Sequence, residues 1–170
     1  AMACFGSWPV FTRLGTLTLD LPVMVLIRFV VPAVFFLPVI LRVGLVPRDV
    51  ALRTLLVVIA GSGVPFFLCA AAALVFAPVA EAAPLIPGTP PLFVALYMMA
   101  FERHRFRRIQ LSGLVLIALG IAVVVGFRIF QSHAIVVGHV LALLAAAFWS
   151  AYTVAFRASG LSAVECAALV

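Results

Sequence analysis

The sequence predicts an all-α membrane protein, a bundle of transmembrane helices with six spans and the start of a seventh, from a fold of two inverted five-helix repeats. Of its 170 residues, 67% are hydrophobic and 9% charged, and the mean hydropathy is +1.37. Too little polar surface is left to cover a water-soluble globule. The apolar residues also form runs of about 20, the length of a membrane-crossing helix. The predicted spans are 1–18, 21–41, 54–76, 79–101, 109–127 and 134–156, and a further run begins at Leu161.

Each of the first two predicted spans places an unusual side chain inside the membrane. Residues 1–18 lack the basic segment and the cleavage site of a signal peptide, so we interpret them as a true span with Trp8 near mid-membrane. In 21–41, Arg28 lies about seven residues from the outer end, roughly 10 Å deep. An arginine at a helix centre costs on the order of 2.5–3.5 kcal/mol, so Arg28 must face the bundle or a cavity. Two interpretations of Arg28 stay open: it pairs with another helix or snorkels to the interface, or it contacts a substrate.

Glycine and proline interrupt the third and fourth predicted spans. The segment IAGSGVPFF within 54–76 predicts a bend in the third span. Four prolines interrupt the fourth span: Pro84, Pro87, Pro90 and Pro91. Each removes a backbone donor that nothing in hydrocarbon replaces, so residues 79–101 can cross only as a broken helix whose freed carbonyls face protein or a water-filled cavity. Such a helix is typical of a solute path, and Pro84 and Pro87 are candidates for the cavity wall.

Several polar or small residues in these spans are further candidates. Glu81 lies two or three residues inside the outer end of its span, and three interpretations stay open: a carboxylate solvated at the interface, a partner for Arg28, or a protonatable gate. Gly113 and Gly120 are two turns apart on one face of 109–127 and predict close helix packing. In 134–156, Tyr152 can bond across helices or contact a solute.

The arginines predict the orientation of the spans. All 11 basic residues are arginine, and the formal net charge is +6. Eight lie in connections on one side of the predicted membrane, two on the other, and Arg28 within a span. Because positively charged loops stay in the cytoplasm, the larger group marks the cytoplasmic side, and the N-terminus is cytoplasmic. The larger group is Arg42, Arg48, Arg53, Arg103, Arg105, Arg107, Arg108 and Arg157, and the smaller is Arg13 and Arg128.

An internal repeat relates the sixth span to the first. GSWPVFTRL is followed by LPVMVL thirteen residues after Trp8, and AFWSAYTVAFR is followed by LSAVEC twelve residues after Trp149. Five spans separate the two starts, so the second copy enters the membrane inverted. The two tryptophans then have matching depths, which is the geometry of an inverted-repeat transporter, and we favour both as cavity-lining residues over plain helix packing. The predicted units are 1–128, the first repeat, and 134–170, the truncated start of the second.

The order of motifs resembles the EamA-like family of the drug/metabolite transporter superfamily. The motifs are LIRF, IAGSGVPFF, APVAEAAPLIPGTPPLFVAL, FERHRFRRIQLSGLVLIALGIAVVV and FWSAYTVAFR. The resemblance implies ten-helix carriers with cytoplasmic termini and a central cavity for metabolites, amino acids or drugs. It also implies a multi-pass protein of the cell membrane, such as a bacterial inner membrane. Since residue 1 is not methionine and the last apolar run stops at Val170, we expect a fragment of such a carrier.

Other functions are excluded or left as alternatives. The sequence has no HExxH, P-loop or G-x-S-x-G segment and no metal-ligand spacing, so we expect neither an enzyme nor a metal or other cofactor. Nucleic-acid binding is excluded because the arginines lie in short connections. A secondary transporter with a small-molecule substrate is favoured, and a membrane structural or assembly protein is the alternative. A coupling proton or ion and the oligomeric state stay open.

Overall fold

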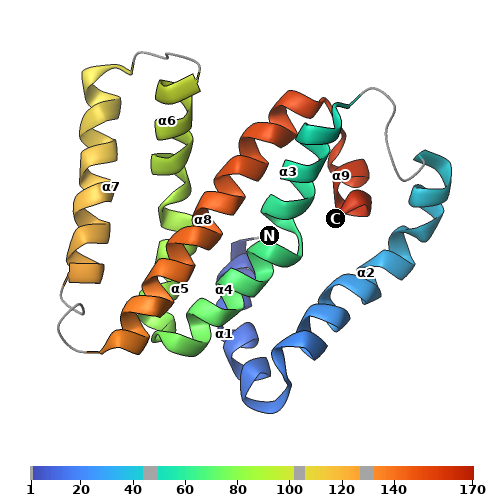
Figure 1. Cartoon of the computed structure of the whole chain (residues 1–170), viewed down its shortest axis with the longest axis horizontal. Helices are drawn as coiled ribbons and strands as arrows, with labels where there is room; N and C mark the ends of the chain where they lie inside the picture. Colours follow the sequence, from blue (N-terminus) through green and yellow to red (C-terminus); the bar gives the residue numbers. More distant parts are fainter. Residues whose placement is uncertain (1, 44–49, 102–105, 127–131) are drawn as a thin grey trace.

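The computed structural model describes residues 2–43, 50–101, 106–126 and 132–170, and all regular structure in them is helical (Figure 1). This confirms the all-α prediction. The helices are α1 (Met2–Thr18), α2 (Leu21–Val43), α3 (Leu52–Ser62), α4 (Val64–Phe76), α5 (Val79–Gly88), α6 (Pro90–Phe101), α7 (Arg108–Gly126), α8 (His133–Ser159) and α9 (Ala163–Leu169).

Five described stretches are long and apolar enough to cross a membrane: Leu21–Leu41, Leu52–Phe76, Val79–Ala100, Arg108–Gly126 and His133–Ser159. They confirm a helical membrane bundle. Helix α1 has 17 residues, which is the lower end of the spanning length. The predicted span at 1–18 therefore stays a prediction.

Both predicted helix breaks are present. The third span bends at Gly63, which ends α3 and caps α4; a Cβ there would collide with the Ile59 carbonyl oxygen. The fourth span breaks at Thr89, between α5 and α6. The buried Thr89 hydroxyl donates to the Leu85 carbonyl over 2.7 Å, and the Thr89 N–H donates to the same carbonyl over 3.2 Å.

Helix α8 lies along α3 and α4 in the middle of the molecule, where the backbones come very close (Figure 1). A Cβ on Gly61 would lie 2.5 Å from the Phe148 carbonyl oxygen, and one on Gly138 would lie 2.7 Å from the Ala77 nitrogen. Small residues permit such approach between membrane helices, and the dispersion gained there holds them together. The broken α3–α4 span is thereby fixed to α8.

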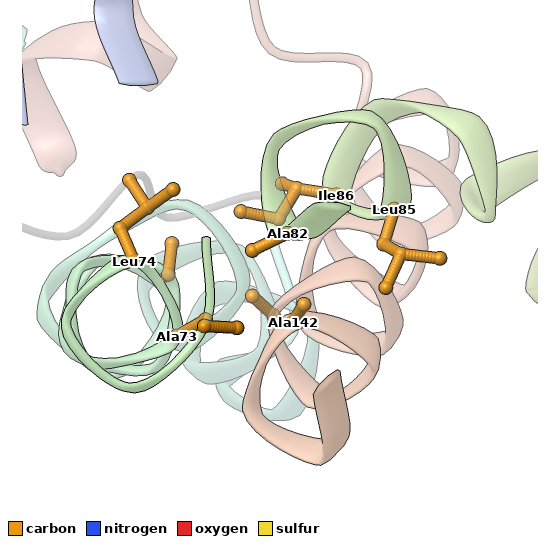
Figure 2. Packing of buried hydrophobic residues seen from close by; sticks show 9 residues of the cluster. Ala73, Leu74, Ala82, Leu85, Ile86 and Ala142 are labelled. Carbon is orange, nitrogen blue, oxygen red and sulfur yellow. The ribbon is translucent and has the colours of Figure 1, made fainter. Parts of the chain in front are cut away.

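The core lies where α4, α5 and α8 meet (Figure 2). Leu85 and Ile86 of α5 fill the space beside Ala73 and Leu74 of α4 and Ala142 of α8. Further buried members are Ala70, Ala77, Ala82 and Ala145. Small residues on α4 and α8 leave room for larger ones on α5, so the core depends on matched volumes.

Helices α2 and α7 form the margins of the bundle (Figure 1). None of the most apolar part of either is buried within the chain. The predicted close packing at Gly113 and Gly120 is wrong, because a Cβ on either would meet nothing within 4 Å. The two glycines do lie on one face of α7, as their spacing predicts, but no described helix packs against that face.

Some sequence predictions lie outside the described residues. These concern the side chains of Arg42, Arg48, Arg103, Arg105 and Arg128, with Glu102 and the beginning of its motif. Of the described arginines, Arg53, Arg108 and Arg157 lie near one end of the bundle, at the start of α3, the start of α7 and the end of α8 (Figure 1). These three arginines share one end of the bundle, and the orientation of the spans stays a prediction.

Candidate functional site

Arg28 of α2 reaches an aromatic surface made by α1 and α4. Its guanidinium carbon lies 5.6 Å from the Trp8 ring centroid and 4.8 Å from that of Phe67. Both distances are within the range of cation–π attraction. Among the described residues Arg28 has neither a hydrogen bond nor an ion pair. The aromatic faces hold the cation in position and leave its five donors for another partner.

Two hollows meet at Arg28. The first, of about 440 Å³, lies between α1 and α2, and the second, of about 450 Å³, lies between α2, α8 and α9. Trp8 and Phe67 line the first; Tyr152 and Cys166 line the second. Both volumes lie in the range of small-molecule sites. Arg28 contributes to both walls, so one cation serves both hollows.

The two tryptophans of the predicted repeat meet the same ring. Trp8 stacks on Phe66 with centroids 6.4 Å apart, and Trp149 is tilted against Phe66 at 5.9 Å. Both are half-buried. The indole N–H of Trp8 is buried without a hydrogen-bond partner among the described residues. A second donor, for which the described residues supply no acceptor, therefore lies beside Arg28.

Glu81 lies away from Arg28, at the start of α5. Its side chain is 17% exposed, and its Oε2 is 3.2 Å from Nε2 of His139, which is 0% exposed. Among the described residues Glu81 lies beside a histidine and does not pair with Arg28, while the solvated interfacial carboxylate and the protonatable gate stay predictions. His139 is not among the candidates singled out from the sequence. Its signal was a titratable side chain seven residues into an otherwise apolar span.

Of the remaining candidate residues, Tyr152 lies at a hollow beside Arg28 and the two prolines do not. Tyr152 lines the second hollow, and its hydroxyl accepts from Cys166 Sγ at 3.8 Å. Pro84 and Pro87 are exposed on α5, on the side away from its buried residues. Neither proline is brought to Arg28, and their place in a cavity wall stays a prediction. The described cysteines, Cys69 and Cys166, are free thiols.

These features define a multi-pass membrane protein with small-molecule-sized hollows. The model of the EamA-like transporter family matches residues 1–126 of the 170, and the chain belongs to this family. The family consists of membrane transporters of the drug/metabolite type rather than enzymes. Its membership implies small-molecule substrates and a lipid bilayer as surroundings. No match was found among curated proteins or among solved structures.

Proposed function

We propose that this chain is part of a secondary transporter that moves small anionic organic solutes, whether metabolites, amino acids or drugs, across the cytoplasmic membrane. The observation that carries the proposal is Arg28, a cation within a membrane span that lies between two hollows and has no anionic partner among the described residues. A charged side chain at such depth is costly and marks a solute or ion path more often than a structural contact.

The chemistry of the site favours an anion that has an apolar body. Guanidinium binds carboxylates, phosphates and sulfonates through paired hydrogen bonds, and the Trp8 N–H can add a third donor. Phe67 and the ring of Trp8 would pack against the apolar part of the same solute. The site therefore fits a planar or aromatic anion better than an inorganic ion.

Alternating access would use the helix break at Thr89 as a hinge. Thr89 joins α5 and α6 within one span, whereas α3 and α4 both pack along α8 and would move with it. We place the first inverted repeat at 1–128 and the start of the second at 134–170, with α8 and α9 belonging to the second. In inverted-repeat carriers, one repeat rocks against the other around a fixed site.

We also propose the inner membrane of a bacterium as the location, with the N-terminus in the cytoplasm. Support comes from the charge of the bundle ends, because Arg53, Arg108 and Arg157 gather at one end and Arg13 lies toward the other (Figure 1). Under the positive-inside rule, the richer end is cytoplasmic.

Uptake into proteoliposomes tests the proposal. Full-length protein is reconstituted, and uptake of three labelled probes is followed: p-toluenesulfonate as an aromatic anion, leucine as a zwitterion, and tetraethylammonium as a cation. The sulfonate stays charged at every working pH, so it does not cross as a neutral acid. We expect saturable sulfonate uptake above that of protein-free vesicles. Flux of the cation alone would contradict the anionic assignment, and flux of none would favour a structural or assembly protein.

A further inference from the structure

The two hollows that meet at Arg28 lie at different levels along α2. The α2 residues that line the first hollow fall within 24–32, and those that line the second fall within 28–36. Since a helix rises about 1.5 Å per residue, the second hollow begins about 6 Å further along α2 than the first. The first extends toward the connection between α1 and α2, and the second toward α9 (Figure 1). Arg28 therefore stands between two hollows that extend toward opposite ends of the bundle.

The walls of the two hollows differ in polarity. Besides Arg28, the first hollow has one hydroxyl side chain in its wall, the buried Thr12. The second hollow has three side chains with a hydroxyl or thiol group, and its apolar wall includes three phenylalanines. The polar residues are Ser62, Tyr152 and Cys166, and the phenylalanines are Phe29, Phe36 and Phe156. The second hollow is thus suited to an aromatic solute that carries a further polar group.

The side chain of Tyr152 is held in one position in this wall. Its ring stacks on Phe156, with centroids 5.7 Å apart and an interplanar angle of 18°. Its backbone nitrogen lies so close to α3 that a Cβ on Gly61 would be 2.9 Å away. Its hydroxyl accepts from Cys166 Sγ at 3.8 Å. Contacts with three elements fix the phenol before a solute arrives, which lowers the entropy cost of binding.

The Tyr152 hydroxyl keeps a donor for a solute. A phenol both donates and accepts, and the contact with Cys166 uses only the accepting side. Within 2–43, 50–101, 106–126 and 132–170, no acceptor faces the Tyr152 O–H. The Ser62 hydroxyl differs, because it donates to the Val58 carbonyl over 2.8 Å. Arg28 on α2 and Tyr152 on α8 therefore present donors to the same hollow from two different helices.

We propose that the second hollow is a distinct solute subsite for aromatic anions that carry a hydrogen-bond acceptor opposite their charge, an inference that rests on the proposed transport function. The anionic group lies on Arg28, the ring lies among the phenylalanines, and the acceptor receives the Tyr152 O–H. During transport the anionic group stays on Arg28, while the body of the solute moves from the wall of Trp8 to the wall of Tyr152. Tyr152 then determines specificity for the polar group of the solute.

Uptake of two sulfonates of nearly equal size by full-length protein in proteoliposomes tests the subsite. Opposite its charge, p-toluenesulfonate carries a methyl group and p-hydroxybenzenesulfonate a hydroxyl group. Half-saturating concentrations are measured for wild type and for Tyr152→Phe, which removes only the phenolic oxygen. Comparing both probes in both proteins isolates the contact between the two hydroxyls. A neutral hydrogen bond contributes about threefold to tenfold in affinity, so preference for the hydroxylated probe should fall by that factor in Tyr152→Phe.

The matched control is Tyr97→Phe on α6, because Tyr97 lines neither hollow. It should keep the wild-type preference. An unchanged preference in Tyr152→Phe, or an equal loss for both probes, would overturn the role of Tyr152. Continued uptake of p-toluenesulfonate in that case would leave the transport proposal intact.

Alkylation by N-ethylmaleimide in nanodiscs measures occupancy of the subsite without transport. The Ala163→Cys variant places a thiol in the wall of the second hollow, and Ala158→Cys places one on the exposed end of α8, outside both hollows. Mass spectrometry reads each site separately. We expect p-hydroxybenzenesulfonate at millimolar concentration to slow alkylation of Ala163→Cys severalfold and to leave Ala158→Cys unchanged. Adding Arg28→Gln should abolish the protection.

The two experiments separate the subsite from the transport proposal. Unslowed alkylation of Ala163→Cys in a protein that carries the probe would overturn the second subsite alone. Protection without any uptake would support the subsite and contradict transport. Neither protection nor uptake would overturn both.

Discussion

The centre of the bundle and its margins are both apolar, yet they use different residues. Where α8 meets α3 and α4, glycine and alanine occupy many of the buried positions, and at Gly61 and Gly138 the backbones nearly touch. On α2 and α7, large aliphatic side chains point outward, with Leu116 69% exposed. In a bilayer, lipid covers large side chains at no loss, so burying them does not drive helix association. The difference teaches that small residues, not hydrophobic ones, identify the packed faces.

Enlarging a glycine at the centre should have the largest effect. We expect Gly138→Leu to lower the free energy of unfolding by about 3 kcal/mol or more, the upper end for overpacking, because even a Cβ would meet Ala77 backbone. Gly120→Leu on α7 is the matched control. It should be neutral or gain up to about 0.8 kcal/mol from helix propensity. Unfolding in detergent measures both, and equal losses would refute the distinction.

Removing an aromatic ring tests the same comparison by deletion. Phe67 is fully buried on α4, so Phe67→Ala should cost about 3–5 kcal/mol. Phe35 on α2 is 79% exposed, and Phe35→Ala should change the unfolding free energy by less than about 0.5 kcal/mol. A large loss for Phe35 would show that α2 packs against protein that the described residues do not include.

Trp8 lies on the border between the two regions and should affect flux more than stability. It is half-buried and touches Phe66, Phe67 and Arg28, so Trp8→Ala should cost less than the 3–5 kcal/mol of a fully buried ring. Uptake of p-toluenesulfonate should fall severalfold. Leu17→Ala, an exposed position on the same helix, is the control. Normal flux with a large stability loss would assign Trp8 to packing.

The smallest expected effect concerns serine hydroxyls. Ser150 of α8 donates to the Ala146 carbonyl over 2.6 Å and lies 3.3 Å from the Pro90 carbonyl of α6. Ser112 of α7 bonds only within its helix in the described structure, to Ile109. Ser150→Ala should cost about 0.6 kcal/mol, the average for a hydrogen bond between membrane helices, and Ser112→Ala close to nothing. Thermal unfolding of both variants measures the difference.

Much of the architecture follows from local sequence. The lengths of the apolar runs determine the spans, and the glycines and prolines at 59–67 and 84–91 determine the two breaks, because their backbone chemistry acts within a few residues. The Trp8 and Arg28 candidates also came from local signals, since a tryptophan or an arginine at that depth is unusual in either span.

Contacts between helices distant in the chain could not be predicted from the sequence, because local signals do not say which helices meet. Gly113 and Gly120 show the same kind of spacing as packed glycines, but no local signal says that their face has no described partner. None of the three interpretations of Glu81 included His139, because this neighbour is 58 positions later in the chain and on another helix. Pairings of this kind depend on how the helices are arranged.

The central claim is that Arg28 binds the transported anion, and one comparison tests it most directly. Initial uptake of p-toluenesulfonate is measured for wild type, Arg28→Lys and Arg28→Gln, together with unfolding in detergent. A charge-assisted hydrogen bond contributes about 1.5–3 kcal/mol, so we predict at least a tenfold loss of uptake for the glutamine variant, partial retention for lysine, and near-native stability for both. Wild-type uptake by a stable Arg28→Gln protein would contradict the account.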